Sequence, residues 1–159
     1  MFTSVLDSPL GRMVIQANEH YVQFIGFPEV TPDETPSALT VEAAKQLQEY
    51  FDGKRQSFDF SSRQTGTEFQ QGVWSTLKTV EPGKPISYTA LSKKMNNPLA
   101  IRAIASANGK NNLMIIVPCH RIIGSDGSLV GYAGGLWRKK WLLEHESTMM
   151  NTGQAVLNL

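Results

Sequence analysis

The first third of the chain alternates apolar and polar residues with the two-residue period of β-strands. Three such runs, FTSVLDS, GRMVIQAN and YVQFIGF, cover residues 2–8, 11–18 and 21–27 and are separated by turn-forming residues. Short β-rich runs divided in this way predict a meander of strands. Residues 40–54, TVEAAKQLQEYFDGK, instead place apolar residues at a helical period. Residues 57–60, SFDF, are a candidate further strand, so this part predicts a small α/β unit.

Helix start signals dominate the second half of the chain. Thr67 and Gln70 form a capping box ahead of an apolar periodic run. Ser87 can cap the short segment YTALSKKM, and Asn97 with Pro98 are a cap and first-turn pair for a third helix, LAIRAIASANGK. Two short helices across the tight NNP turn are typical of a helix-turn-helix.

The tract SSRQTG between the two halves has the composition of a linker. We therefore predict an α+β protein with a small N-terminal α/β domain over residues 1–62 and a mainly helical domain over residues 67–147. Glycines crowd residues 124–135, which predicts a loop or wing, so the second domain is a candidate winged helix-turn-helix. The segment LWRKKWLLEHE closes it as a helix, and residues 148–159 are expected to form a loose C-terminal tail.

The third helix of this half has two distinct faces. At about 100° per residue, one side carries the residues that we expect to face the core: Ile101, Ile104, Ala105 and Asn108. A separate stripe of small residues consists of Ala100, Ala103 and Ala107. Such a stripe lets a helix lie close to another helix or to a different surface. Arg102 beside the stripe favours DNA as that surface, with Ala100 and Ala103 facing it.

Charge is divided unequally between the two halves. Residues 1–66 hold five basic and nine acidic side chains, a net charge of −4, whereas residues 67–146 hold ten and five, a net charge of +5. The second half is therefore expected to face a polyanion, although ordinary solvated surfaces would explain the same split. No run approaches the roughly 18 apolar residues of a membrane span, and the N-terminus does not read as a signal peptide.

One cysteine excludes an internal disulfide and suits the reducing cytoplasm. Three histidines without paired-ligand spacing predict no metal site, and we expect no cofactor. The cysteine, Cys119, lies in the apolar, strand-like run IVPCHRIIG and precedes His120, a proton acceptor.

A lone cysteine is usually a small buried hydrophobic residue, but a neighbouring histidine is what a nucleophilic thiol needs. Adjacent residues of a strand point to opposite faces, so either the chain turns sharply at Cys119 or a water links the thiol to the imidazole. A carboxylate should then hold the ring in one tautomer. Glu144 and Glu146, at the end of the last helix, are the candidates.

The segment IVPCHRIIGSDGSLVGYAGGLWRKKWLLEHE resembles the active-site segment of the O6-alkylguanine-DNA alkyltransferases. TEFQQGVW, PGKPISYTALS and NPLAIRAIASANGKNN are similar to further segments of that family at the expected spacing. The likeness covers about residues 67–146, and the first 60 residues resemble the family in layout. The resemblance implies an N-terminal domain of ribonuclease H-like layout followed by a winged helix-turn-helix domain.

The resemblance also implies roles for the residues around the thiol. Cys119 corresponds to the alkyl-accepting thiolate, His120 to a water-linked base, and Glu146 to the carboxylate partner of that base. Asn111 is similar to an asparagine that ties a helix to the active-site turn.

Other positions are implied to bind DNA and the damaged base. Tyr88 resembles a tyrosine that rotates the 3′ phosphate, and Arg102 an arginine that fills the stack after the nucleotide leaves. The implied base pocket consists of Tyr88, Tyr132, the backbone carbonyls of Cys119 and Ile122, and the N–H of Ala133.

The implied function is direct repair of O6-alkylguanine in double-stranded DNA, with O4-alkylthymine as a second candidate substrate. A monomer would flip the base out and transfer its alkyl group irreversibly to Cys119, once. Two rivals stay open: a cysteine hydrolase, which would turn over, and a winged-helix transcription factor with an inert thiol. Ile101 departs from the small residues common before the arginine, and it either packs inward or crowds the minor groove.

Overall fold

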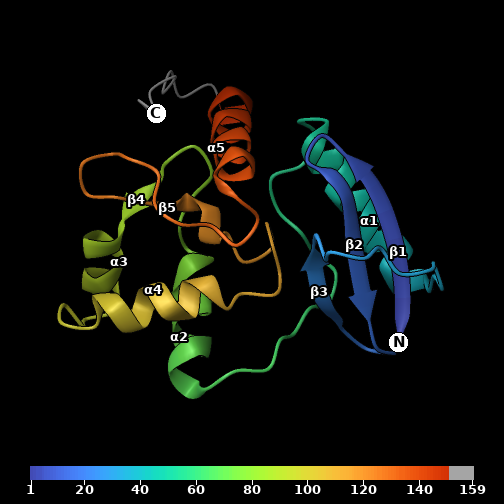
Figure 1. Cartoon of the computed structure of the whole chain (residues 1–159), viewed down its shortest axis with the longest axis horizontal. Coiled ribbons are helices and arrows are strands. Elements are labelled where there is room, and N and C mark those ends of the chain that lie inside the picture. Colours follow the sequence, from blue (N-terminus) through green and yellow to red (C-terminus); the bar gives the residue numbers. More distant parts are fainter. Residues whose placement is uncertain (151–159) are drawn as a thin grey trace. The chain divides into compact units, whose positions relative to one another are not determined.

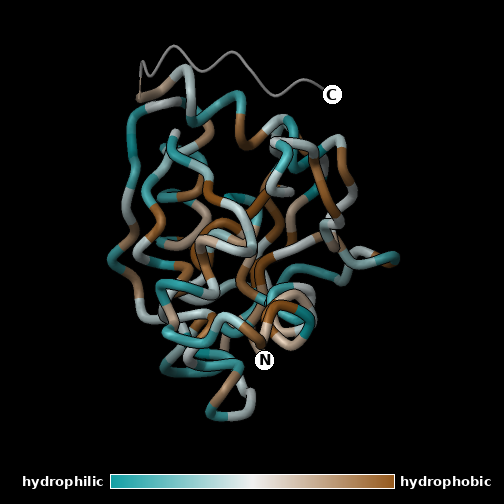
Figure 2. Tube along the Cα trace, turned by 90° about the vertical axis from the view of Figure 1, so that its left-hand side faces the viewer, coloured by the Kyte–Doolittle hydropathy of each residue, from teal (hydrophilic) through white to brown (hydrophobic). Residues whose placement is uncertain are grey.

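The computed structural model describes residues 1–150, which form two compact units (Figure 1). The first contains residues 1–65 together with residues 112–114, and the second contains residues 66–111 and 115–150. Figure 2 shows how hydrophobic and hydrophilic stretches alternate along the chain. No helix within the described residues is both long and apolar enough to cross a membrane.

An antiparallel three-stranded sheet, in the order β1-β2-β3, is the frame of the first unit. Its strands are β1 (Phe2–Ser8), β2 (Gly11–Ala17) and β3 (Val22–Gly26), so the predicted meander is confirmed. Ser8 pairs with Gly11 at the first hairpin, where Gly11 has a φ of +112°. Glycine adopts this backbone conformation without a steric penalty, which explains the residue at this tight turn.

Helix α1 (Ala38–Phe51) packs across β1 and β2 and confirms the predicted helix of this unit. It begins after Ser37, whose side chain forms a capping box with Thr40. Leu47 and Tyr50 on its inner face are fully buried. The core of the first unit therefore lies between this helix and the sheet.

The strand predicted at residues 57–60 is wrong. The residue that pairs with β3, in a single parallel β-bridge, is Ser62 instead. Within the predicted strand, the Asp59 N–H donates to the side chain of Gln46 on α1, and the ring of Phe58 packs against an aromatic ring of the same helix. The Gln46 side chain thus accepts from a backbone N–H that a strand would have paired with the backbone of a neighbouring strand.

The second unit is mainly helical. In chain order, its described part contains α2 (Glu68–Leu77), β4 (Ile86–Ser87), α3 (Tyr88–Lys94), α4 (Ile101–Gly109), β5 (Ile122–Ile123) and α5 (Leu136–Met150). The Thr67–Gln70 capping box opens α2 and Ser87 caps α3, as predicted. Strands β4 and β5 pair in parallel, and residues 124–135 form turns and irregular loop.

Two boundaries in this unit differ from the prediction. Asn97 and Pro98 do not open α4, because Asn97 accepts a hydrogen bond from the Ala100 N–H and so closes a turn ahead of the helix. Helix α5 continues to Met150, so residues 148–150 are helical rather than part of the predicted tail. The rest of that tail, residues 151–159, lies outside the described residues.

The faces of α4 were predicted in part. Ile104 and Asn108 are buried as expected, but Ile101 is 38% exposed, because it is the first residue of the helix and borders the preceding turn. Ala107, in the stripe of small residues, is buried, which fits the helix–helix alternative for that stripe. Its carbonyl accepts a hydrogen bond from the indole of Trp74 on α2 at 2.9 Å, a partner that the period of one helix cannot reveal.

Candidate active site

The chain turns sharply at the cysteine. Pro118 has φ −81° and ψ 64°, and the Cys119 N–H donates to the Val117 carbonyl at 2.8 Å. This combination is an inverse γ-turn, and a single turn of 3-10 helix, Cys119–Arg121, follows it. The strand-like interpretation of this run is therefore wrong at Cys119. Of the two alternatives drawn from the sequence, the structure contains the sharp turn, and the water link stays a prediction.

Two features hold the approach to this turn. Asn111 Nδ2 donates to the Val117 carbonyl at 2.9 Å and lies 3.4 Å from Cys119 Sγ. Ile115 has φ +73° although it is β-branched and buried. Residues of this type rarely occupy that region, so the surrounding structure must fix the backbone there. The thiol is consequently placed by an amide side chain and a constrained backbone, and it is only 5% exposed.

Asn108 on α4 links the turn to α3. Its Nδ2 donates to the Tyr88 hydroxyl at 3.1 Å and lies 3.5 Å from the Cys119 carbonyl oxygen. The other amide atom, Oδ1, is buried without a partner among the described residues. Asn108 was expected in the core, but its contact with two of the proposed site residues was not predicted from the sequence.

A buried cluster of ionisable groups lies directly after the thiol. His120 Nε2 is 2.8 Å from Glu146 Oε2 on α5, and both side chains are fully buried. Arg121 donates two hydrogen bonds to the same carboxylate, from Nε to Oε1 at 2.9 Å and from Nη2 to Oε2 at 2.8 Å. Its third nitrogen, Nη1, donates to the carbonyl of Val80 at 2.7 Å. Glu146 is therefore the carboxylate that meets His120.

Glu144, the other candidate, points elsewhere. Its side chain is exposed and lies 3.9 Å from Lys140 on the same helix. It therefore takes no part in the buried cluster.

The cluster fixes the proton on the imidazole. Burial alone would raise the pKa of Glu146, but His120 and Arg121 outweigh burial and bring it well below its ordinary value. An ionised carboxylate accepts only, so His120 Nε2 must carry the ring proton and donate it. The other nitrogen, Nδ1, is then an acceptor, and it is buried without a partner within residues 1–150.

Burial keeps both members of the thiol–imidazole pair neutral at rest. It raises the pKa of Cys119, and the hydrogen bond from Asn111 and the charge of Lys139 offset this only in part. It lowers the pKa of His120, and Glu146 offsets that only in part. The site therefore stores a protonated thiol next to an imidazole that can accept a proton.

One buried lysine was also not predicted from the sequence. Lys139 on α5 is completely buried, and its Nζ donates to the Val130 carbonyl at 2.8 Å. Burial lowers its pKa to about 8, while the charge of a Cys119 thiolate raises it. A cation in this position would stabilise that thiolate. The helical period could have indicated that Lys139 is buried, because residues 139, 142, 143 and 146 share one face of α5.

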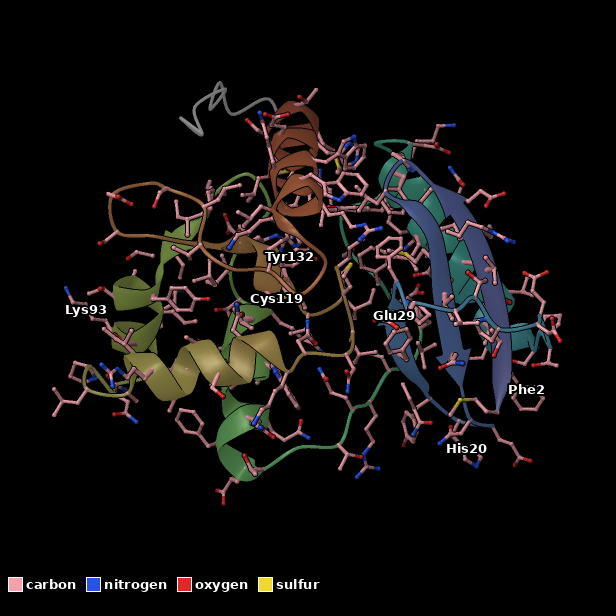
Figure 3. The ribbon with its side chains drawn as sticks, in the orientation of Figure 1. Phe2, His20, Glu29, Lys93, Cys119 and Tyr132 are labelled. Carbon is pink, nitrogen blue, oxygen red and sulfur yellow. The ribbon has the colours of Figure 1, made fainter. Side chains whose placement is uncertain are left out.

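The proposed pocket residues gather around the thiol to different extents. Charge on Cys119 raises the pKa of both Tyr88 and Tyr132, although burial is the larger cause for each. Tyr132 lies next to Cys119 in Figure 3, and its buried hydroxyl and the thiol shift each other's pKa. Ile122 is fully buried at the start of β5, whereas Ala133 is exposed in the loop.

The proposed DNA-binding residues lie on α4 and just before it. Arg102 and Ala103 are exposed, and Ala100 is half-buried. The described residues contain no group of three or more His, Cys, Asp or Glu side chains arranged to hold a metal ion.

A buried thiol followed directly by an imidazole that a carboxylate anchors is the arrangement expected of proteins that use a cysteine nucleophile. The chain belongs to the 6-O-methylguanine DNA methyltransferase family. The family's DNA-binding domain matches residues 68–148, and its ribonuclease-like domain matches residues 1–61. The resemblance drawn from the sequence is thereby confirmed, and the mixed α/β fold consists of a ribonuclease-like domain followed by a DNA-binding domain.

Individual relatives are similar over almost the whole chain. A methylated-DNA–protein-cysteine methyltransferase of Methanosarcina acetivorans is 37% identical over 93% of this chain and 99% of its own length. The crystal structure of Mycobacterium tuberculosis O6-methylguanine methyltransferase has a TM-score of 0.84 and 37% identity, with 93% of each chain covered. A structure of Mycobacterium tuberculosis OGT in complex with DNA has a TM-score of 0.85 and 38% identity, with 94% of each chain covered.

Proposed function

We propose that this protein removes the alkyl group from O6 of guanine in double-stranded DNA and keeps it on Cys119. The observation that carries the proposal is a buried thiol followed directly in the sequence by a buried imidazole whose Nδ1 has no partner among the described residues. The names of the relatives support the reaction, and the DNA bound to one structural relative supports the substrate.

In the proposed reaction the sulfur attacks the alkyl carbon while the bond from that carbon to O6 breaks. The thiol proton passes through a bridging water to His120 Nδ1, and Glu146, bonded to Nε2, stabilises the imidazolium that forms. The departing guanine takes a proton from the Tyr88 hydroxyl. The imidazolium then loses its proton to solvent, and the Tyr88 hydroxyl is reprotonated from solvent. The products are a thioether on Cys119 and a restored guanine.

The transfer ends the protein's activity. A thioether has no acidic leaving group, and the sequence contains no second cysteine that could displace the alkyl group. O4-alkylthymine presents the same type of carbon–oxygen bond and is the second candidate substrate.

We infer that α3, the following turn and α4 form the helix-turn-helix, with residues 124–135 as its wing. The exposed Arg102 and Ala103 and the half-buried Ala100 then face the duplex. The target atom lies inside the base stack, so the nucleotide must be flipped out before it can react. Arg102 would fill the gap that it leaves, and Tyr88 would turn the 3′ phosphate.

The flipped base would lie against Tyr132. The Cys119 and Ile122 carbonyls would accept from the guanine amino group, and the Ala133 N–H would donate toward O6. The buried Tyr132 hydroxyl beside the thiol supports this placement.

Incubation with duplex DNA containing O6-methylguanine should add one methyl group to the protein, on the peptide that contains Cys119. Mass spectrometry of the intact protein and of its peptides measures this directly, and Cys119→Ala should gain no mass. Many turnovers per molecule would indicate the cysteine hydrolase. An unchanged mass together with tight binding to one operator sequence would indicate the transcription factor.

Arg102→Ala should weaken repair of duplex DNA far more than transfer from free O6-alkylguanine. The variant loses a side chain that replaces a stacking partner, which costs about 1–3 kcal/mol. Single-turnover rates on the two substrates separate the effects, with Arg12→Ala, an exposed arginine on β2, as the matched control. Equal losses on both substrates would show that Arg102 supports the fold instead.

A further inference from the structure

A buried amide on α4 lies between the proposed proton donor and the turn that carries the thiol. Asn108 is only 5% exposed. Its Nδ2 donates to the Tyr88 hydroxyl oxygen at 3.1 Å, and the Cys119 carbonyl oxygen lies 3.5 Å from the same nitrogen. A carbonyl oxygen at that place would be repelled by the carbonyl of Cys119, so the nitrogen must occupy it. The orientation of the amide is therefore fixed.

Stability does not explain an asparagine at this position. The other amide atom, Oδ1, is buried and has no partner among the described residues. An unpaired buried carbonyl group destabilises a fold, and an apolar side chain of similar size would not carry that penalty. The amide is therefore better explained by the hydrogen bond that it makes to Tyr88.

This hydrogen bond determines where the Tyr88 hydroxyl can send its own proton. The amide nitrogen of Asn108 donates and cannot accept, so the hydroxyl hydrogen must point away from it. Burial raises the pKa of Tyr88, the hydrogen bond from Asn108 offsets part of that rise, and charge on Cys119 adds to it. The Tyr88 hydroxyl is thus close enough to the thiol to meet a base held there, and Asn108 favours the ionised form of that hydroxyl.

We infer that Asn108 is a positioning residue for the departure of guanine: it directs the Tyr88 proton toward the base and stabilises the phenolate that remains. The inference rests on the proposed function, in which Tyr88 protonates guanine as the bond from the alkyl carbon to O6 breaks. A hydrogen bond strengthens as its acceptor gains negative charge, so this one contributes more in the transition state than before it. Asn108 acts through Tyr88 rather than on the alkyl group.

The test compares two reactions of the same thiol that differ in the leaving group. O6-methylguanine in duplex DNA leaves as guanine and takes up a proton. Iodoacetamide instead loses iodide, which needs none: the Cys119 sulfur bonds to its CH2 carbon, the carbon–iodine bond breaks, and the thiol proton passes to solvent.

Asn108→Leu should slow methyl transfer from the duplex about 10–100-fold, the contribution of one hydrogen bond to a charged group. Labelling of Cys119 by iodoacetamide should proceed at the unaltered rate. Single-turnover rates at rising protein concentration separate the maximal rate, which should fall, from the apparent affinity for the duplex, which should not change. Asn108→Ala, which leaves space instead of filling it, should show the same pattern.

A double variant shows whether Asn108 acts through Tyr88. Tyr88→Phe should slow transfer at least as much as Asn108→Leu, and combining the two should cause no further loss. Ser92→Ala is the matched control, because it removes another hydrogen bond of the second unit, from the fully buried Ser92 hydroxyl to the Thr89 carbonyl on α3. It should leave both reactions unchanged. Urea unfolding checks that each variant is folded.

Equal slowing of both reactions would overturn the inference, since Asn108 would then support the thiol through the Cys119 carbonyl. An unchanged rate of Asn108→Leu on the duplex would also overturn it, as would a further loss in the double variant. If the unaltered protein is labelled by iodoacetamide but takes no methyl group from the duplex, the proposed function has failed rather than the role of Asn108.

Discussion

Glu146→Gln is expected to destabilise the protein by about 3–5 kcal/mol. The carboxylate is fully buried and is held by His120 and by two bonds from Arg121. Removing one partner of a buried ion pair leaves the other charge uncompensated, which is the costly way to break such a pair. Urea unfolding at pH 7 measures the loss. Glu144→Gln is the matched control, because that exposed residue on the same helix should change the free energy of unfolding by no more than about 0.5 kcal/mol.

A double variant tests the physical reason. Arg121→Met combined with Glu146→Leu removes both charges and fills similar volumes, so it should recover much of the stability that Glu146→Gln loses. A double variant as unstable as the single one would show that the loss comes from packing or from His120, not from the stranded guanidinium.

The same cluster makes stability depend on pH in one direction. The pKa of Glu146 in the folded protein lies below its ordinary value, so the stability that it contributes is present above about pH 4.5 and is lost as the pH falls. Burial also depresses the pKa of His120, so the unfolded chain takes up that proton first, below about pH 6.5. Both effects weaken the folded state on acidification, and neither does so above pH 7.

Local sequence signals predicted most of the fold. The meander and the capping boxes depend on neighbours within a few residues, and such patterns can be read directly. The failures came where a distant partner took over. The Asp59 N–H donates to Gln46 on α1, and the Ala107 carbonyl accepts from the Trp74 indole on α2, so each of these residues meets a partner from another segment.

The candidate site was predictable by residue but not by geometry. The motif around Cys119 identified the thiol and its partners, yet its apolar run favoured a strand. The inverse γ-turn at Pro118 could not be inferred from hydrophobic pattern, because the pattern describes burial and not φ and ψ. Arg121 was missed because its burial depends on Glu146, which lies on another element. These charges are buried only because the fold supplies their partners.

His120→Gln is expected to slow alkyl transfer at pH 7 by about 10²–10⁴-fold, the usual contribution of a positioned general base. In the unaltered protein, thiol and imidazole are both neutral between about pH 7 and 9, because burial raises the pKa of Cys119 and lowers that of His120. The internal proton transfer is therefore available throughout this range, and it does not depend on hydroxide. The variant must rely on hydroxide, so its thiolate fraction rises about tenfold per pH unit while the pH stays below the thiol pKa.

The quantity to measure is the single-turnover rate of the unaltered protein divided by that of His120→Gln, on one duplex, from pH 7 to 9. Lys139, with a pKa of about 8, loses its charge in the same window, but it does so in both proteins and largely cancels in the ratio. The ratio should fall about tenfold per pH unit, and urea unfolding should show that the variant is folded. His20→Gln, an exposed histidine in the first unit, should leave rate and profile unchanged. A ratio that stays constant from pH 7 to 9 would mean that His120 is not the base for the thiol, and that Cys119 loses its proton by another path.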